Sequence, residues 1–318
     1  MAPKISVIIP SYNRAALVEQ TVRSVLAQSF SDRELIIVDD GSTDDTHDRL
    51  RDLIGAGQCR YIYQNNQGRS EARNAGAGVA SSTYLMFLDS DDVLEPAALQ
   101  TLFEHAMKDK NAGLIAGMKV LVNDQGEQQG APEPFQLEAE FTGKRINDAY
   151  IDGLIFTPSA YIVKRSLFDK VGGYDKSFEP AEDFDFFVKC CQASTISATR
   201  DVTVKALRHG NNTANTDLLR ASIKICEKNI RLIAENDGDE DITKAVRRAK
   251  WLINCGNAHY SLAENLKAFR NYWAALVAYP SVSLHRRYRI LRQMIASLVP
   301  SSALRRLRPR GSHTLWDP

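Results

Sequence analysis

Cysteine is scarce in this chain of 318 residues, and the five cysteines that occur form no C-x-x-C pair. An odd number of cysteines without paired spacing argues against a disulfide framework and against a structural zinc site. We therefore expect reduced thiols, as in proteins of the cytosol.

Long apolar runs are also missing. The apolar run at residues 5–9, ISVII, is too short for the core of a signal peptide. No stretch reaches the length of about 20 apolar residues that a membrane-spanning helix needs. We expect a cytoplasmic protein, for which peripheral contact at the cytoplasmic face of the inner membrane is the one membrane association left open.

Acidic residues are absent from one long segment. Of 40 basic and 39 acidic residues, ten basic and no acidic ones lie between Asn265 and Trp316. Residues 1–264 consequently hold 30 basic and 38 acidic side chains, although the whole chain has a net charge of +1. Such asymmetry predicts an anionic partner for the C-terminal segment.

The remaining composition suffices for a large folded domain. Hydrophobic residues make up 44% and charged residues 25% of the chain, as in ordinary globular proteins. The first half alternates short β-branched or aromatic runs with segments of helical periodicity, which predicts a mostly parallel α/β sheet with helices on both faces. The expected strands are residues 5–9, 34–38, 60–63, 84–88 and 160–164, and the expected helices include residues 69–80, 95–108 and 184–193.

Aspartates follow two of the expected strands. Asp39 and Asp40 come after residues 34–38, and a second cluster, Asp89-Ser90-Asp91-Asp92, comes after residues 84–88. Ligands of parallel sheets bind beyond the carboxyl ends of the strands, so both clusters are expected at one edge. Carboxylates gathered there suit Mg²⁺ or Mn²⁺, although each cluster alone is also typical of a solvated turn that begins a helix.

A third acidic cluster contains Glu182, Asp183 and Asp185. Three carboxylates within four residues repel one another, so the pKa of at least one should be raised, which suits a general base. The alternative is the acidic first turn of an ordinary helix. Further along, Arg208 and His209 could face a phosphate and a metal ion, although a single histidine is more commonly structural.

The order of these motifs is far more specific than any one of them. Over residues 4–212 the chain contains SVIIPSYNR, ELIIVDDGSTDDT, NQGRSEARNAG, YLMFLDSDD, VGGYD, AEDFDFF and LRHGNN, in that order. This series resembles the family 2 inverting glycosyltransferases of the GT-A type and covers about two thirds of the chain. The resemblance implies a GT-A (Rossmann-like) α/β fold, with a mostly parallel central sheet flanked by helices and a C-terminal helical extension.

The resemblance also implies roles for single residues. The implied binding residues for the nucleotide and the sugar are Pro10, Tyr12, Arg14, Asp40, Arg73, Asp89 and Glu182. The implied metal ligands are Asp91 and His209, with Asp92 as an auxiliary. Asp183 matches the catalytic base of the family.

The implied activity is transfer of a sugar from a nucleotide diphosphate to a hydroxyl group of a glycan or a lipid-linked acceptor, in the synthesis of cell-surface polysaccharide or glycolipid. By resemblance a UDP-sugar is preferred over a GDP- or dTDP-sugar, and Mn²⁺ or Mg²⁺ is the expected cofactor. Two alternatives stay open, namely an inactive nucleotide-sugar-binding protein and a sugar transferase to polyprenyl phosphate. A nucleotidyltransferase is disfavoured, because SVIIPSYNR lacks a Gly- and Lys-rich phosphate loop.

The chain is expected to have three parts. Residues 1–214 form the catalytic domain, with the nucleotide-sugar half ending near residue 110 and the acceptor half at about 111–214. Within the latter, the polar residues 123–150 are expected to form a loop or hairpin. A helical region follows at 215–280, and a basic amphipathic segment at 281–318.

The basic segment has apolar residues at helical spacing, namely Leu284, Tyr288, Leu291, Ile295 and Leu298. A basic amphipathic helix can lie on an anionic leaflet, whereas the alternative is a helix packed on the rest of the chain with a solvated basic face. We favour the membrane surface, because a solvated face rarely lacks acids altogether. No nucleic acid partner is expected, since the catalytic motifs already account for nucleotide chemistry.

Overall fold

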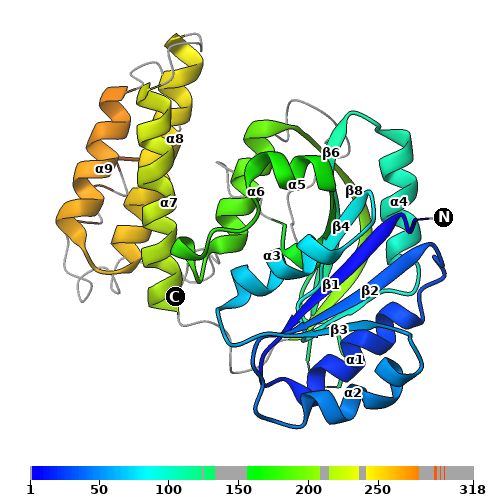
Figure 1. The fold of residues 1–318 in the computed structure, drawn as a ribbon. Coiled ribbons are helices and arrows are strands. Elements are labelled where there is room, and N and C mark those ends of the chain that lie inside the picture. Colours follow the sequence, from blue (N-terminus) through cyan, green and yellow to red (C-terminus); the bar gives the residue numbers. More distant parts are fainter. Residues whose placement is uncertain are drawn as a thin grey trace. The chain divides into compact units, whose positions relative to one another are not determined.

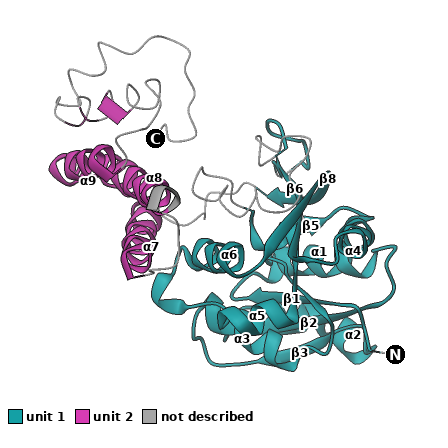
Figure 2. Cartoon of the chain, turned by 90° about the horizontal axis from the view of Figure 1, so that it is seen from above, with its two compact units in different colours: residues 1–212 teal, residues 213–318 magenta. Residues whose placement is uncertain are grey.

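The computed structural model describes residues 2–123, 125–132, 156–207, 215–235 and 241–278, together with residues 290, 291, 294 and 297. The chain divides into two compact units, residues 1–212 and 213–318 (Figure 2). Each unit has a hydrophobic core of its own.

The first unit is built on an eight-stranded sheet in the order β3-β2-β1-β4-β7-β6-β8-β5 (Figure 1). The strands are β1 (Ile5–Ser11), β2 (Arg33–Asp39), β3 (Arg60–Tyr63), β4 (Tyr84–Phe87), β5 (Asp92–Leu94), β6 (Ala112–Val122), β7 (Tyr161–Lys164) and β8 (Thr195–Leu207).

Strand direction divides this sheet into two halves. The pairs among β1, β2, β3 and β4 are parallel, as the strand–helix alternation predicts. Strand β7 runs antiparallel to both β4 and β6, and β5 runs antiparallel to β8, while β6 and β8 are parallel. The sheet is therefore mixed, and β5, β6 and β8 were missing from the predicted strands.

Helices cover both faces of the sheet. They are α1 (Ala15–Leu26), α2 (Thr46–Gly55), α3 (Arg69–Val79), α4 (Ala98–Lys108), α5 (Arg165–Val171) and α6 (Glu182–Ala193). The core on one face joins the apolar sides of α1, α2 and α4 to β1 and β2. On the other face an aromatic cluster joins Phe87 of β4 to Phe168 of α5 and Phe186 of α6, with ring centroids 5.4 to 6.4 Å apart.

The second unit is helical, as the periodicity of residues 218–279 predicts. Its helices are α7 (Asn215–Glu235), α8 (Asp241–Ser261) and α9 (Asn265–Ala278). Tyr272 of α9 is buried and its hydroxyl donates to Asn257 Oδ1 at 2.8 Å, which ties α9 to α8. Among the described helices, none combines the length and the apolar composition that a bilayer crossing demands.

Two predicted features fall largely on residues outside the described ranges. Of the basic segment 281–318, only Ile290, Leu291, Met294 and Ser297 are described. Of the expected loop or hairpin at 123–150, the structure describes a short antiparallel bridge between Val122 and Gln128 and the chain as far as residue 132.

Candidate functional site

The carboxyl ends of three adjacent parallel strands bring two acidic clusters to one edge of the sheet. Strands β2 and β4 lie on either side of β1, and Asp39 and Asp89 mark their carboxyl ends. The segment that leaves β1 carries Tyr12 and Arg14 between them. This placement agrees with the expectation that both clusters share an edge.

The segment after β1 is tied to the segment after β2. Asn13, which adopts a left-handed φ of 51°, donates its backbone N–H to Ser42 Oγ at 2.9 Å and accepts the Thr43 N–H at 2.8 Å through its side-chain oxygen. Asparagine tolerates this backbone conformation better than most residues. The two loops therefore hold each other, and they present a side chain of Tyr12 that is 47% exposed. Pro10, before them, is half-buried.

Asp40 is buried and organises the chain that precedes α3. Its carboxylate accepts hydrogen bonds from Gln64 Nε2 at 2.7 Å, from the Gln67 N–H at 2.9 Å and from the Gly68 N–H at 2.9 Å. An ionised carboxylate offers about four acceptor positions, so little capacity is left for a ligand. The resemblance implies that Asp40 binds the nucleotide, and the structure shows its carboxylate engaged mainly with residues 64–68.

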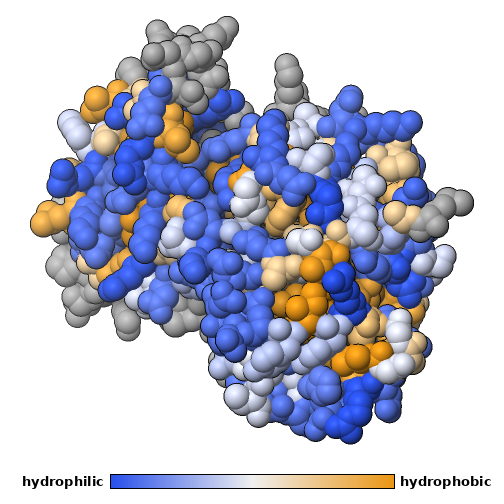
Figure 3. Space-filling view, viewed as in Figure 1, coloured by the Kyte–Doolittle hydropathy of each residue, from blue (hydrophilic) through white to orange (hydrophobic). Residues whose placement is uncertain are grey.

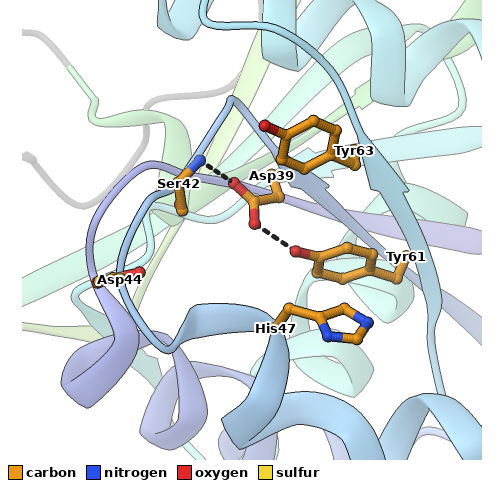
Figure 4. A pocket seen from close by; sticks show the side chains of 6 residues that line it. All are labelled: Asp39, Ser42, Asp44, His47, Tyr61 and Tyr63. Carbon is orange, nitrogen blue, oxygen red and sulfur yellow. Dashed lines mark hydrogen bonds between the residues drawn. The ribbon is translucent and has the colours of Figure 1, made fainter.

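The Asp39 side chain points to the opposite face of the sheet from that of Asp40, because successive side chains of a strand alternate between the two faces. It accepts the Ser42 N–H at 2.7 Å through Oδ1 and the Tyr61 hydroxyl through Oδ2 (Figure 4). Burial, followed by the hydrogen bond to Asp39, raises the pKa of Tyr61.

Asp39 also lines an open hollow of about 500 Å³. The lining residues are Asp39, Ser42, Asp44, His47, Tyr61 and Tyr63 (Figure 4). The Asp44 carboxylate is engaged as well, since it accepts the Ala15 N–H at 3.1 Å and the Thr46 hydroxyl at 2.5 Å. Both acids of this hollow thus support the loop after β2.

Arg73 joins the second acidic cluster to the third. Its guanidinium donates through Nη2 to Asp89 Oδ1 and through Nη1 to Glu182 Oε1, both at 2.7 Å, and it lies 5.0 Å over the ring of Tyr174. The side chain is 3% exposed. Arg73 was predicted to bind the nucleotide or the sugar, and the structure places its charge between the Asp89 and Glu182 carboxylates. Beyond the VGGYD motif, the sequence carries no specific signal for Tyr174.

The first two turns of α3 contact all three acidic regions. Gly68 donates its N–H to Asp40 at 2.9 Å, Ser70 donates its N–H to Glu179 Oε1 at 2.9 Å, and Arg73 binds the other two clusters. The amino end of a helix carries a partial positive charge, which favours carboxylates around it. Helix α3 is therefore the element that assembles the site.

The carboxylates after β4 differ in exposure. The side chains of Asp89 and Asp91 are 35% and 23% exposed, and Asp91 Oδ2 lies 3.5 Å from Arg14 Nη1. Asp92 is buried, and burial together with the negative charge of Asp89 raises its pKa well above its usual value. Ser159, which belongs to none of the sequence motifs, accepts the N–H of Asp89 through Oγ at 3.0 Å.

These carboxylates fit a hard divalent cation. Asp89 and Asp91 are accessible oxygen donors, which Mg²⁺ and Mn²⁺ prefer, and Mg²⁺ is commonly held by one or two carboxylates together with substrate phosphates. Within the described ranges no three acidic, histidine or cysteine side chains are arranged to enclose an ion. Phosphate oxygens and water would therefore complete the coordination. His209, the other predicted ligand, lies outside the described residues.

Asp183 is half-buried in the first turn of α6, and its Oδ1 accepts the N–H of Phe184 at 2.7 Å. Burial, and next the charge of Glu182, raise the pKa of Asp183 to about 6. Such a shift is expected for clustered carboxylates and suits a general base near neutral pH. Asp185 is buried instead, with Oδ2 at 3.5 Å from Lys189 Nζ.

Sequence comparison identifies relatives of the first unit, residues 1–212. Residues 6–172 match the family described as Glycosyl transferase family 2. Chondroitin synthase of Pasteurella multocida is 30% identical over 221 residues, which are 68% of this chain but only 22% of that protein. The GalNAc(5)-diNAcBac-PP-undecaprenol beta-1,3-glucosyltransferase of Campylobacter jejuni is 37% identical over 145 residues, which are 45% of this chain and 43% of that one. The chain thus spans about a fifth of the first of these relatives.

Solved structures share the fold at low identity. The S. aureus TarS 1-349 structure in complex with UDP-GlcNAc matches with a TM-score of 0.66 and 19% identity, covering 92% of this chain and 89% of that one. The mannosyltransferase PcManGT from Pyrobaculum calidifontis, in complex with GDP-Man and Mn²⁺, matches with a TM-score of 0.59 and 17% identity, covering 96% and 83%. These matches confirm the predicted GT-A fold. Since the family match covers more than half of its length, the chain belongs to glycosyl transferase family 2.

Proposed function

We propose that the protein is a metal-dependent, inverting glycosyltransferase. It moves a sugar from a nucleotide diphosphate sugar to a hydroxyl group of a glycan or a lipid-linked acceptor, in the synthesis of cell-surface polysaccharide or glycolipid. The observation that carries this proposal is the buried guanidinium of Arg73, which joins Asp89 of the exposed acidic cluster to Glu182, the neighbour of Asp183. Arg73 thus connects the proposed donor-binding edge to the residue next to the proposed base.

The donor is proposed to be a UDP-sugar, bound at the edge between β2 and β4. The exposed ring of Tyr12 can stack on a base, and the half-buried Pro10 borders the same segment. Asp40 would act on the base mainly by holding residues 64–68 in place. The TarS complex with UDP-GlcNAc supports a uridine donor by similarity of fold.

Asp91 is the proposed ligand of Mn²⁺ or Mg²⁺, with His209 as a second ligand and Asp89 close to the ribose or the sugar. A bound divalent ion would offset the charge of the diphosphate as it departs. Arg14, which lies 3.5 Å from Asp91, is placed to orient that carboxylate and to face phosphate oxygens. The complex of PcManGT with GDP-Man and Mn²⁺ supports the choice of cation.

Asp183 is the proposed base. With a pKa of about 6 it is mostly ionised at pH 7, and it still accepts a proton far more readily than an ordinary aspartate. It would take the proton of the acceptor hydroxyl while that oxygen attacks the anomeric carbon opposite the diphosphate. One displacement inverts the configuration, in contrast to retaining hydrolases, which use a second carboxylate as a nucleophile.

The acceptor is proposed to be a glycan or a lipid-linked saccharide. The similarity to the Campylobacter jejuni glucosyltransferase, whose name includes an undecaprenol-linked substrate, supports the lipid-linked class. A polyprenyl phosphate acceptor is the second candidate, since it needs the same donor and metal. Residues 281–318 are proposed to hold the enzyme at an anionic membrane surface, on the charge pattern of the sequence.

Asp183→Asn and Asp91→Ala test the assigned roles. We expect Asp183→Asn to lower kcat by about 10²- to 10⁴-fold, because the base is lost, while donor affinity stays within about threefold. Asp91→Ala should instead weaken Mn²⁺-dependent binding of the donor. Calorimetry with UDP-sugars, with and without Mn²⁺, and a product assay measure both effects.

Asp48→Asn, at an exposed carboxylate of α2, is the matched control and should change neither property. Equal loss of donor binding in the two site variants would contradict the separation of roles. Donor binding without any transfer in the wild type would instead favour an inactive nucleotide-sugar-binding protein.

A further inference from the structure

Helix α9 exposes large apolar side chains along one stripe. Leu266, Trp273 and Val277 are 75%, 57% and 64% exposed. Together with the exposed Arg270 they follow one another at steps of four, three and four residues, which places all four on the same side of the helix. We call this set the α9 stripe.

The other sides of α9 are already occupied. Ala268 and Tyr272 pack against Ile290 and Met294, so the described residues of the C-terminal segment cover a different side of the helix. Ala275 packs against α8 in a separate cluster. The α9 stripe is therefore the side that the described part of this unit leaves to solvent.

A hollow of about 290 Å³ between α8 and α9 adjoins the stripe. It is lined by Arg248, Leu252, Trp273, Ala274, Val277 and Ala278. Trp273 and Val277 belong to both features, so stripe and hollow form one surface. Hydrophobic residues reach the surface of this unit among hydrophilic ones in the space-filling view (Figure 3).

The charged side chains at the α9 stripe and the hollow are positive. Lys267 of α9 is paired with Glu264 at 3.3 Å. The positive charge therefore comes from the exposed Arg270 of α9 and from the exposed Arg248 of α8 beside the hollow. The sequence then continues without an acid as far as Trp316. Apolar side chains, an indole and basic residues on one solvent-facing side are the composition of a surface that enters the boundary between lipid headgroups and acyl chains.

We propose that the α9 stripe, with the hollow beside it, docks on an anionic lipid bilayer. Leu266, Trp273 and Val277 enter the interface, and Arg248 and Arg270 bind lipid phosphate. The basic charge selects an anionic surface over a neutral one. This inference deepens the proposed membrane contact, because it names residues of α8 and α9 outside the segment 281–318, and it holds whether or not the protein transfers a sugar.

Flotation of the full chain with vesicles tests this surface. The wild type should float with vesicles that contain phosphatidylglycerol. A much smaller fraction of it should float with vesicles of phosphatidylcholine alone. We expect L266S/W273S/V277S and R248Q/R270Q each to weaken binding at least about tenfold. The matched controls are L218S/L232S and R220Q/R231Q, at exposed positions of α7, and they should bind like the wild type.

Fluorescence locates the contact without altering α9. In W316F the remaining indoles are Trp273 and the fully buried Trp251, so quenching by brominated acyl chains should report Trp273. Hydrogen exchange in peptides of residues 213–318 shows whether each variant keeps the second unit folded, and sedimentation shows whether copies associate.

The proposal would be overturned if L266S/W273S/V277S and R248Q/R270Q both floated with the vesicles as well as the wild type does. It would also be overturned if brominated lipid did not quench the fluorescence of W316F. Loss of binding only when the arginines at 305, 306, 308 and 310 become glutamine would assign the contact to the tail instead. A variant that changes only from dimer to monomer would assign the α9 stripe to a second copy.

Discussion

Arg73 holds a buried positive charge between two carboxylates that come from distant parts of the chain, Asp89 and Glu182. A charge in such a place is stable only while its partners remain, because removing one member leaves the others uncompensated in a poorly solvated site. The residue therefore links two requirements, the integrity of the fold around α3 and the geometry of the proposed base.

Arg73→Met tests this dependence. We expect the free energy of unfolding to fall by about 3–5 kcal/mol, because the buried Glu182 loses its close partner. Denaturant unfolding followed by circular dichroism measures the change. Arg69→Met is the control, since Arg69 is 48% exposed and 3.7 Å from the same carboxylate, and it should cost less than about 1 kcal/mol. A similar decrease in the free energy of unfolding in both variants would show that burial of the Arg73–Glu182 ion pair is not the cause of the decrease.

The pH dependence of turnover should follow the protonation of Asp183. Its pKa of about 6 means that the carboxyl group is protonated below that pH and cannot accept a proton, so kcat should fall as pH falls through about 6. The Glu182 charge contributes to the raised value, so Glu182→Gln should lower the pKa and move the acidic limb to lower pH. Glu71→Gln, at a partly exposed residue of α3, should leave the limb in place. The proposal would be contradicted if the acidic limb of the kcat–pH profile stayed in place or moved to higher pH in Glu182→Gln.

At the scale of elements, α3 lies so close to the sheet that one of its residues must be glycine. A Cβ added at Gly76 would lie 2.4 Å from Ile8 Cγ2 and 3.1 Å from Val38 Cγ2. Both neighbours are buried β-branched residues of β1 and β2, which cannot move aside freely. The close approach of α3 keeps its first turn against the carboxyl ends of the strands.

Gly76→Ala should therefore destabilise the protein by about 1–3 kcal/mol and weaken donor binding by displacing α3. Gly78→Ala is the matched control on the same helix, since a Cβ there has no atom within 4 Å. It should stabilise slightly, by up to about 1 kcal/mol, through helix propensity. Thermal unfolding with and without UDP compares them, and equal behaviour would contradict the close packing of α3.

At the scale of the whole molecule, the two units have separate cores and should respond separately. A Cβ at Gly256 would lie 2.6 Å from Cε1 of the buried Tyr272, so Gly256→Ala should loosen the contact between α8 and α9 by about 1–3 kcal/mol. Hydrogen exchange should then rise in peptides of residues 213–318, while donor affinity is unchanged.

The control for this variant is Gly55→Ala, at a position in the first unit where a Cβ has no atom within 4 Å. It should change exchange in neither unit. A loss of donor affinity in Gly256→Ala would show that the two units depend on one another for binding.

Local pattern along the chain was enough for several features. The β-branched runs, the helices between them and the aspartates after the strands predicted β1 to β4 and the edge where the acids gather. This succeeded because a parallel strand–helix–strand unit is built from neighbours in sequence, whose burial shows as periodicity. The raised pKa within the cluster around Asp183 was predictable for the same reason, since adjacent charges repel wherever the chain goes.

Local pattern did not reveal β6 and β8. Strand β6 contains two glycines, Gly113 and Gly117, which are unusual in a strand. They leave room for the side chains of Ser194 and Thr203, which a Cβ at either position would meet. Strand β8 mixes polar and apolar residues and has two exposed residues, Arg200 and Asp201, near its middle, so its sequence does not mark it as part of a central sheet. Their pairing depends on segments about 80 residues apart, which no local window contains.

By itself the sequence determined the family, the acidic clusters and the edge of the sheet on which two of them lie, because these depend on neighbouring residues and on motif order. Only the tertiary structure decided that Asp40 faces residues 64–68, that Arg73 is buried between carboxylates and that the α9 stripe is exposed. Each of these depends on which side chain packing buries, and Arg73 and Glu182 are 109 residues apart. Burial is a property of the assembled core, so it follows from long-range contacts and not from any single segment.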